Sequence, residues 1–158
     1  MLRRAHQRLL SLYGRLPRRM RRFAVRRVAP SFHVGAMCFV ERDDGALLLV
    51  RHAYRRHWGV PGGLLQRGEE PADGARREAR EETDLDVELV SEPIVVIDVA
   101  ARRIDVAYRC RVPGTVPEPI TPTSAEIVEV RWFARHRLPV LQAEAAGALS
   151  RLDAERQG

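Results

Sequence analysis

The stretch 63–85 reads GLLQRGEEPADGARREAREETDL and carries the most informative pattern in the chain. Residues 71–83 are predicted to form a helix, because a proline suits the first helical turn and acidic residues favour the positive end of a helix dipole. On such a helix Glu78, Glu81 and Glu82 stand at i, i+3 and i+4 and share one face. Three neighbouring carboxylates repel one another unless a cation offsets their charge, and Mg²⁺ takes oxygen ligands of this kind. The spacing therefore favours a divalent-metal site.

The acidic face of this helix could be a metal site or an ordinary charged surface. Runs of charge on a helix usually form a solvated face, here with ion pairs such as Arg77–Glu81. The neighbouring Gly62 and Gly63, however, permit close approaches of the backbone that a side chain would block. Placed just before an acidic helix, these glycines would bring backbone groups up to a metal-bound diphosphate. These glycines, together with the register of the charged residues described next, lead us to favour metal binding over the solvated face.

The same stretch resembles the Nudix box, whose pattern is G-x5-E-x7-R-E-U-x-E-E-x-G-U, where U is a bulky apolar residue. The residues that match in register are Gly63, Glu69, Arg77, Glu78, Glu81, Glu82 and Leu85. Asp84 departs from the expected glycine, and Ala79 fills the first U with a small residue. A left-handed residue is common just after a helix, and aspartate tolerates that conformation better than most residues. We therefore expect the departure at Asp84 to leave the ligands intact. The resemblance covers about residues 32–150.

This resemblance implies a Mg²⁺-dependent hydrolase, with Mn²⁺ as the alternative ion. It implies that Glu78, Glu81 and Glu82 are the metal ligands and the catalytic residues, and makes Glu78 a candidate general base. Glu69 and Arg77 are implied to pair and to brace the loop against the helix. The expected chemistry is attack of water in line at phosphorus, which breaks a diphosphate linkage while metal and arginine stabilise the charge.

Several other residues are candidates for the site. Glu126, ahead of the strand that contains Trp132, is a candidate for a further ligand or for the base, since some family members draw one from there. Gly62, Gly63 and Arg51 are candidates for substrate binding. Further arginines and histidines lie near the box in sequence and are weaker candidates for contact with substrate: Arg55, Arg56, Arg67, His52 and His57.

The expected substrate is a nucleotide, either a nucleoside diphosphate derivative or a nucleoside triphosphate. Two alternatives stay open: a non-catalytic ligand sensor with the same fold, and an enzyme that removes pyrophosphate from RNA 5′ ends. The intact glutamates argue against the sensor, because degenerate family members usually lose them. Ala100 and Ala101 stand where an ADP-ribose subfamily has a proline, and Tyr108 lies too far from the box for the dinucleoside polyphosphate subfamily. These two substrate classes are thereby disfavoured, and no other is selected.

The fold class predicted for residues 31–158 is α/β, an α+β sandwich in which helices flank a mixed β-sheet, as in the Nudix fold. Two apolar runs, 32–40 and 46–50, flank the turn-forming sequence Asp43-Asp44-Gly45 and predict a β-hairpin. Residues 51–70 are expected to be irregular and 113–123 to form a loop. The remaining expected elements are strands at 87–90, 94–99, 104–112 and 127–133 and a last helix at 138–156.

Residues 1–30 form a separate basic extension, with ten arginines and no acidic residue, although the whole chain carries a formal charge of only +6. Apolar spacing predicts helices at 2–13 and near 20–27. Three interpretations stay open for this segment: packing on the domain, contact with anionic lipid, and contact with nucleic acid or an acidic partner. The chain has no apolar run long enough to span a bilayer, and two distant cysteines suit a reducing cytoplasm. The sequence leaves the oligomeric state open.

Overall fold

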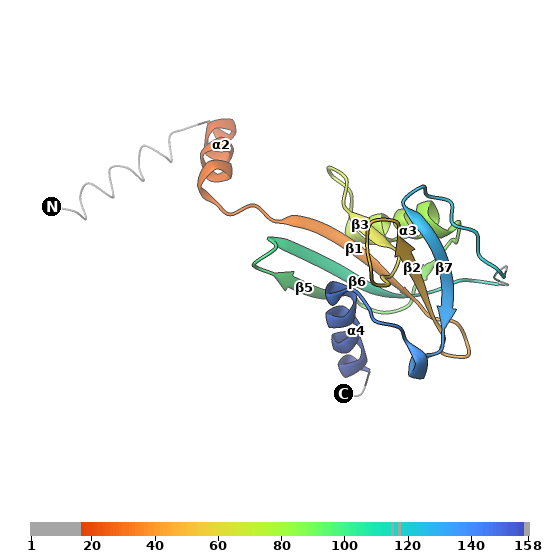
Figure 1. Cartoon of the computed structure of the whole chain (residues 1–158). Coiled ribbons are helices and arrows are strands. Elements are labelled where there is room, and N and C mark those ends of the chain that lie inside the picture. The colour runs from red at the N-terminus through yellow and green to blue at the C-terminus, as the bar shows by residue number, and fades with distance from the viewer. Residues whose placement is uncertain (1–16, 115, 117, 157–158) are drawn as a thin grey trace. The chain divides into compact units, whose positions relative to one another are not determined.

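The computed structural model describes residues 17–114, 116 and 118–156 (Figure 1). The chain divides into two compact units, Met1–Phe32 and His33–Gly158. The helix expected at 2–13 lies outside the described residues, and the domain boundary expected after residue 30 stays a prediction. Among the residues that are described, no helix is both long and apolar enough to cross a membrane.

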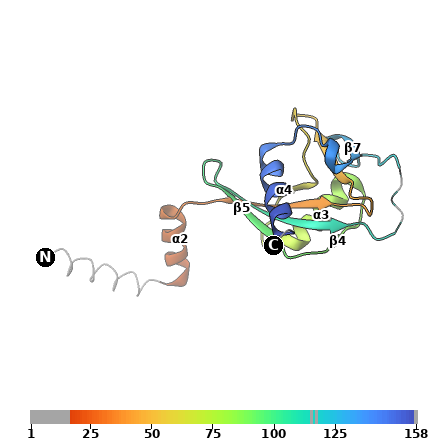
Figure 2. The same ribbon diagram turned by 90° about the horizontal axis from the view of Figure 1, so that it is seen from below.

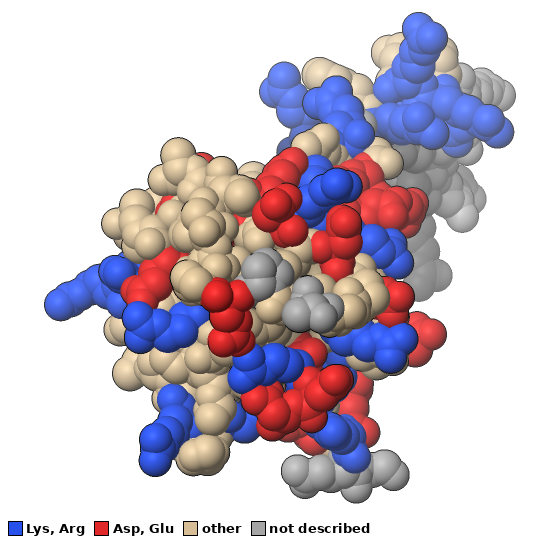
Figure 3. Space-filling view, turned by 90° about the vertical axis from the view of Figure 1, so that its right-hand side faces the viewer, with Lys and Arg blue, Asp and Glu red and all other residues tan. Residues whose placement is uncertain are grey.

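The described part of the first unit is the helix α2, Arg18–Val28, which matches the short helix expected near 20–27. Its N-cap is Pro17, and its first turn contains no acidic residue. Met20 and Phe23 are exposed, and the Arg27 guanidinium carbon lies 5.1 Å from the centre of the Phe23 ring. Figure 3 shows basic side chains gathered over this helix, whereas acidic and basic side chains alternate on the second unit.

The described residues of the second unit form two β-sheets and two longer helices. One sheet is five-stranded, with the order β3-β1-β6-β4 and with β5 also paired to β6. Its strands are β1 (His33–Val40), β3 (Gly62–Leu64), β4 (Glu88–Leu89), β5 (Ile94–Asp98) and β6 (Arg103–Arg111). The second sheet pairs β2 (Leu47–His52) with β7 (Ile127–Phe133). The helices are α3 (Pro71–Thr83) and α4 (Ala143–Glu155), with a short 3₁₀ turn, η1, at Arg135–Arg137.

Pairing within the larger sheet is mixed, as expected. β1 runs parallel to β6 and antiparallel to β3, and β4 and β5 are both antiparallel to β6. The structure thus confirms the predicted class, a mixed sheet flanked by helices. The strands expected at 87–90, 94–99, 104–112 and 127–133 all form, with small differences at their ends.

β1 lies between β3 and β6, and from residue 35 to residue 40 both of its faces are buried. Side chains alternate between the two faces of a strand, so neighbouring residues of β1 enter different clusters. Ala36 and Cys38 pack with Ala75 and Ala79 of α3, whose small side chains let the helix approach the sheet. On the other face, residues of β1 and β5 pack with α4 (Figure 2); this cluster includes Met37, Phe39, Ile94, Ala145, Ala148, Leu149 and Leu152.

The predicted hairpin between the first two strands is wrong. A tight turn does form, in which Arg42 N–H donates to the Ala46 carbonyl at 2.9 Å and Gly45 has a φ of 79°. Beyond it the strands share one isolated bridge, Glu41–Leu47, and then enter different sheets. Residues 35–40 of the first run and 46–50 of the second are buried, so each of these stretches needs cover on two faces. If the two strands formed only a hairpin with each other, one face of each strand would stay open to solvent. In separate sheets, both faces of each strand are covered.

Two smaller differences concern the segments around the site. Residues 51–70 are not wholly irregular, because Gly62–Leu64 forms β3 against β1. The last helix begins at Ala143 rather than near residue 138, because Leu141 forms a parallel bridge with Trp58 and keeps the preceding segment extended. Cys38 and Cys110 are both free and buried, as small apolar residues in strands would be.

Candidate active site

Helix α3 carries the three glutamates and is held at both ends. Pro71 occupies its first turn, where a missing backbone N–H costs nothing. Asp84 ends the helix in the left-handed conformation, with φ 56° and ψ 24°, and its N–H donates to the Arg80 carbonyl at 2.9 Å. The Thr123 hydroxyl donates to the Glu81 carbonyl at 2.8 Å, which ties a distant loop to the last turn. The departure from glycine at Asp84 therefore falls at the cap and leaves the helix intact.

Arg77 connects the loop before α3 with the helix. Its Nε and Nη2 donate to the two carboxylate oxygens of Glu69, at 2.7 and 2.9 Å. Nη2 also donates to the Leu64 carbonyl at 3.2 Å. Glu69 in turn accepts the Gln66 N–H at 2.7 Å, and these donors lower the pKa of Glu69 to about 2, with Arg77 as the larger cause. The pair predicted to brace the loop is thus present as a two-pronged ion pair.

The Glu78 carboxylate lies against the backbone of Gly63. A Cβ atom added at Gly63 would lie only 2.5 Å from Glu78 Oε1, so only glycine leaves room for this carboxylate. Burial raises the pKa of Glu78 above its usual range; the hydrogen bond from Arg77 opposes this shift, and the nearby Glu82 and Glu81 add to it. The raised pKa reflects a half-buried carboxylate that other carboxylates surround.

Glu82 is the most buried of the three glutamates, with 6% of its surface exposed. Its carboxylate accepts the Gly62 N–H at 3.2 Å, and His52 Nε2 lies 3.4 Å from its other oxygen. Glu81 is more exposed and accepts Nη1 of Arg77 at 3.0 Å. Arg77 therefore contacts both Glu78 and Glu81, and the backbone of Gly62 contacts Glu82. The predicted glutamates and glycines come together in one place.

These groups line a cleft of about 530 Å³. Glu126, suggested from sequence, lies on its wall and accepts the Tyr54 hydroxyl at 3.2 Å. His52 and Arg55, two of the weaker candidates, also line the cleft, and Arg55 pairs with Glu144 at 2.9 Å. The remaining lining residues are Met37, Tyr54, Gly59, Val60, Gly62, Gly63, Leu64, Glu78, Glu81, Glu82, Arg103, Ser124, Gln142, Glu144 and Ala145.

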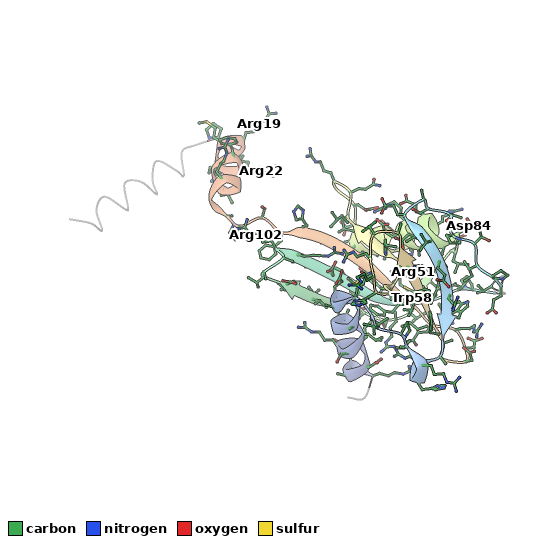
Figure 4. All side chains as sticks on the ribbon, viewed as in Figure 1. Arg19, Arg22, Arg51, Trp58, Asp84 and Arg102 are labelled. Carbon is green, nitrogen blue, oxygen red and sulfur yellow. The ribbon has the colours of Figure 1, made fainter. Side chains whose placement is uncertain are left out.

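Some residues suggested from the sequence do not line the cleft, and some lining residues were not suggested. Arg51 and three of the weaker candidates, Arg56, Arg67 and His57, lie outside it. Arg51 pairs with Glu129 at 3.0 Å and lies over the Trp58 ring, 5.8 Å from its centre (Figure 4). It does not line the cleft. Tyr54, Arg103 and Gln142 were not predicted, although they do line it. The sequence did contain one indication for Arg103. Arg103 and Asp105 are two charged residues at alternate positions of an otherwise apolar strand.

The family model of the NUDIX domain matches residues 31–152. The chain belongs to the Nudix family. It is 33% identical over 127 residues to a MutT-like protein of Streptomyces ambofaciens, a match that spans 80% of this chain and 79% of the relative. Among solved structures, a NUDIX hydrolase from Nitrosomonas europaea is similar with a TM-score of 0.68 and 25% identity, covering 80% of this chain and 73% of that one. An ADP-ribose pyrophosphatase from Streptococcus suis has a TM-score of 0.60 and 25% identity, with 78% and 92% covered.

Membership of the Nudix family confirms the fold and the enzyme class expected from the sequence. This Nudix protein is a hydrolase that acts on acid anhydrides in phosphorus-containing substrates. Its chemistry is pyrophosphate hydrolysis in general terms, and members of the family generally use divalent metal ions.

The carboxylates of α3 have the chemistry that such an ion requires. In the described part of the chain, no group of three or more His, Cys, Asp or Glu side chains is arranged to hold a metal ion. Arg77 donates hydrogen bonds to both Glu78 and Glu81. The donor set itself nevertheless fits a hard divalent cation, since it offers carboxylate oxygens on one helix face. The neighbouring Glu81 and Glu82 help to raise the pKa of Glu78, which reports a repulsion that a bound cation would relieve.

Proposed function

We propose that this Nudix hydrolase cleaves the diphosphate linkage of a nucleoside diphosphate derivative or a nucleoside triphosphate in a Mg²⁺-dependent reaction. The observation that carries the proposal is the half-buried Glu78 carboxylate, which lies against Gly63 in a cleft that Glu81, Glu82 and Glu126 also line. Such a cleft gathers negative charge at one end, where a divalent cation and the phosphates that it carries would neutralise it. Mn²⁺ is the alternative ion.

Each residue of the cleft has a distinct role in this proposal. Glu78, Glu81 and Glu82 would hold the metal ion, which when bound polarises a phosphoryl oxygen and lowers the pKa of the attacking water. Gly62 and Gly63, which line the cleft beside these carboxylates, would contact the diphosphate. Glu69 and Arg77 hold the loop and the helix together. Glu78 and Glu126 are the two groups on the cleft wall that are candidates to accept the proton of the water.

The proposal is tested with a panel of nucleotides, each incubated with Mg²⁺ or Mn²⁺. The panel contains nucleoside diphosphate sugars, nucleoside triphosphates and RNA with a 5′-triphosphate, and product release is followed by chromatography. We expect turnover of at least one nucleotide by the wild type, abolished by EDTA. Glu81→Gln should lower turnover by about 10²-fold or more, because it removes one charged oxygen donor. Loss of turnover in Glu126→Gln would indicate that Glu126 accepts the proton. Glu78→Gln should lose turnover in either case, because Glu78 is also a proposed metal ligand.

Glu92→Gln is the matched control, since Glu92 is exposed and lies outside the cleft. It should turn over substrate at the wild-type rate. Equal turnover by the wild type and Glu81→Gln would contradict the proposed metal site. If the wild type binds nucleotides but hydrolyses none of them, the ligand sensor becomes the better interpretation.

We further infer that the N-terminal unit contacts an anionic surface or partner. The arginines of α2 support this, since Arg18, Arg19, Arg22 and Arg27 are all exposed and no acidic residue precedes Glu41. The cytoplasm is the proposed compartment, and the free, buried thiols of Cys38 and Cys110 support it.

A further inference from the structure

The cleft extends over both faces of the short strand β3. Gly63 pairs with Ala36, whose side chain packs toward α3, and the Glu78 carboxylate lies beside Gly63. The next residue, Leu64, pairs with Gly35 and belongs to the opposite face, on which Met37 packs toward α4. Because successive residues of a strand point to opposite faces, one part of the cleft contains the glutamates and another lies on the α4 side.

Arg103 lines this second part of the cleft and is held by a buried carboxylate. Its Nε lies 2.8 Å from both oxygens of Asp105, and Asp105 is only 3% exposed. Gly35 pairs with Asp105 across the sheet and leaves the space that this ion pair occupies. A Cβ atom added at Gly35 would lie 2.5 Å from Asp105 Oδ1 and 3.1 Å from Arg103 Nη2. The orientation of the Arg103 guanidinium is thus set by the strand register, by the missing side chain of Gly35 and by the buried charge of Asp105.

The outer nitrogens of this guanidinium have no role in the proposed hydrolysis. Asp105 occupies Nε, and within residues 17–114, 116 and 118–156 neither Nη1 nor Nη2 has a hydrogen-bond partner. In contrast Arg55, which also lines the cleft, is paired with Glu144. A guanidinium presents its donors in a planar fork that matches two neighbouring acceptor atoms, and a buried pairing keeps that fork in place.

We propose that Arg103 binds the part of the substrate remote from the reacting diphosphate, through a pair of adjacent hydrogen-bond acceptor atoms on that part. Asp105 is the positioning residue that holds Arg103 for this contact. Two chemical groups supply such a pair: the O6 and N7 edge of a guanine and the oxygens of an additional phosphate. This proposal rests on the proposed function for the identity of the reacting group, and it adds the feature that selects among nucleotide substrates.

The test measures binding without metal, so that no hydrolysis is needed. The full chain in EDTA is titrated calorimetrically with four ligands: GDP, ADP, ADP-ribose and ADP-ribose carrying a 2′-phosphate. GDP and ADP differ in the base, and the last two ligands differ in one phosphate. The main variant is Arg103→Lys, which keeps a positive charge beside the buried Asp105 but presents a single point charge instead of a fork. It should weaken binding of the ligand that carries the acceptor pair by about tenfold.

A second variant, Arg103→Ala, should weaken binding of the same ligand at least as much. If it fails to fold because Asp105 loses its partner, Arg103→Lys decides. Arg102→Asn is the matched control: Arg102 is exposed at the β5–β6 turn, does not line the cleft, and has a φ of 50°, which asparagine tolerates (Figure 4). With Mg²⁺ and a turned-over substrate that carries the acceptor pair, Arg103→Lys should raise KM and leave kcat within about threefold.

Three results would overturn the proposal. They are no measurable binding of any of the four ligands by the wild type, wild-type affinity of Arg103→Lys for all four, and a loss of affinity in Arg102→Asn as large as that in Arg103→Lys. A selective loss for GDP assigns the contact to guanine, and a selective loss for the 2′-phosphorylated ligand assigns it to phosphate. Because the titration needs neither metal nor turnover, its result stands even if Glu81→Gln shows that the proposed hydrolysis is wrong.

Discussion

Gly63 has no side chain at the point where the Glu78 carboxylate lies, and the distances there predict the effect of adding one. In Gly63→Ala the new Cβ would meet Glu78 Oε1 at 2.5 Å, so the carboxylate has to move. Displacing a catalytic group by about 1 Å can cost about 10²-fold in rate, and we expect a loss of kcat/KM of that order. Steady-state kinetics on a substrate from the panel measure it.

Gly147→Ala is the control for this prediction, because nothing lies within 4 Å of a Cβ atom added at Gly147 in α4. It should keep full activity and should stabilise the helix by up to about 1 kcal/mol. Wild-type kcat/KM in Gly63→Ala would show that Glu78 does not need its position against the backbone.

The lowered pKa of Glu69 predicts how the free energy of unfolding depends on pH. Arg77 and the Gln66 N–H lower the pKa of Glu69 to about 2 in the folded protein, whereas the pKa of a glutamate in an unfolded chain is about 4.3. Since the folded pKa is depressed, the stabilisation is complete above the unfolded pKa and is lost as the pH falls through the folded value. The wild type should therefore exceed Glu69→Gln in free energy of unfolding at pH 7, and the difference should shrink between about pH 5 and pH 2.

Urea unfolding of both proteins at several pH values gives this difference directly. Glu92→Gln serves as the reference, because Glu92 is exposed and takes part in no ion pair among the described residues. Suppose that the difference in free energy of unfolding between the wild type and Glu69→Gln instead stays constant over the acid range. In that case the ion pair with Arg77 is not the source of the difference.

At the scale of the elements, the C-terminus of α3 offers a change that should stabilise the protein. Asp84 adopts a φ of 56°, which costs a residue other than glycine about 1 kcal/mol, and its negative charge lies at the negative end of the helix dipole. Asp84→Gly should therefore raise the free energy of unfolding by about 1 kcal/mol and the melting temperature by a few degrees. Activity should not change, because Glu78, Glu81 and Glu82 all precede the cap.

Asp84→Val is the complementary variant, since a β-branched residue tolerates a positive φ poorly. It should lower the melting temperature. If calorimetry instead finds Asp84→Gly less stable than the wild type, the aspartate side chain contributes more to the cap than its backbone conformation costs.

The helix α3 and the shared face of its three glutamates could be predicted from the sequence, because spacing along a helix is a local property. The partner of each strand, in contrast, depends on residues far away in the sequence. The turn at Gly45 was predicted, but the separation of β1 and β2 into different sheets was not, since it depends on pairing with β6 and β7. Arg103 was missed for the same reason: only strand register brings it beside Gly35 and the cleft.

At the scale of the whole molecule, the division at Phe32 predicts that the catalytic unit works alone. A chain that begins at Ser31 should keep kcat and KM within about twofold of the full-length values, because every residue of the cleft lies beyond residue 33. The full-length chain should also bind anionic vesicles or RNA in a salt-sensitive way, and the shortened chain should not, because it lacks ten arginines.

Sedimentation with vesicles and filter binding with RNA, each at low and high salt, measure this difference and separate the two anionic partners. Equal binding by the two chains would exclude the N-terminal arginines as its cause. A large loss of activity in the shortened chain would mean that the N-terminal unit also serves the cleft.

The parallel pairing of β1 with β6 also has a consequence for the way the chain folds. His33 pairs with Arg103, so the first contact of this ladder must close a loop of about 70 residues. A fold with such a contact at its centre forms more slowly than one built from neighbouring elements. During synthesis β1 leaves the ribosome long before β6. Its apolar residues therefore stay exposed to solvent until the rest of the sheet has been made. The strand that joins both halves of the core is thus also the segment most exposed to aggregation while the protein is being made.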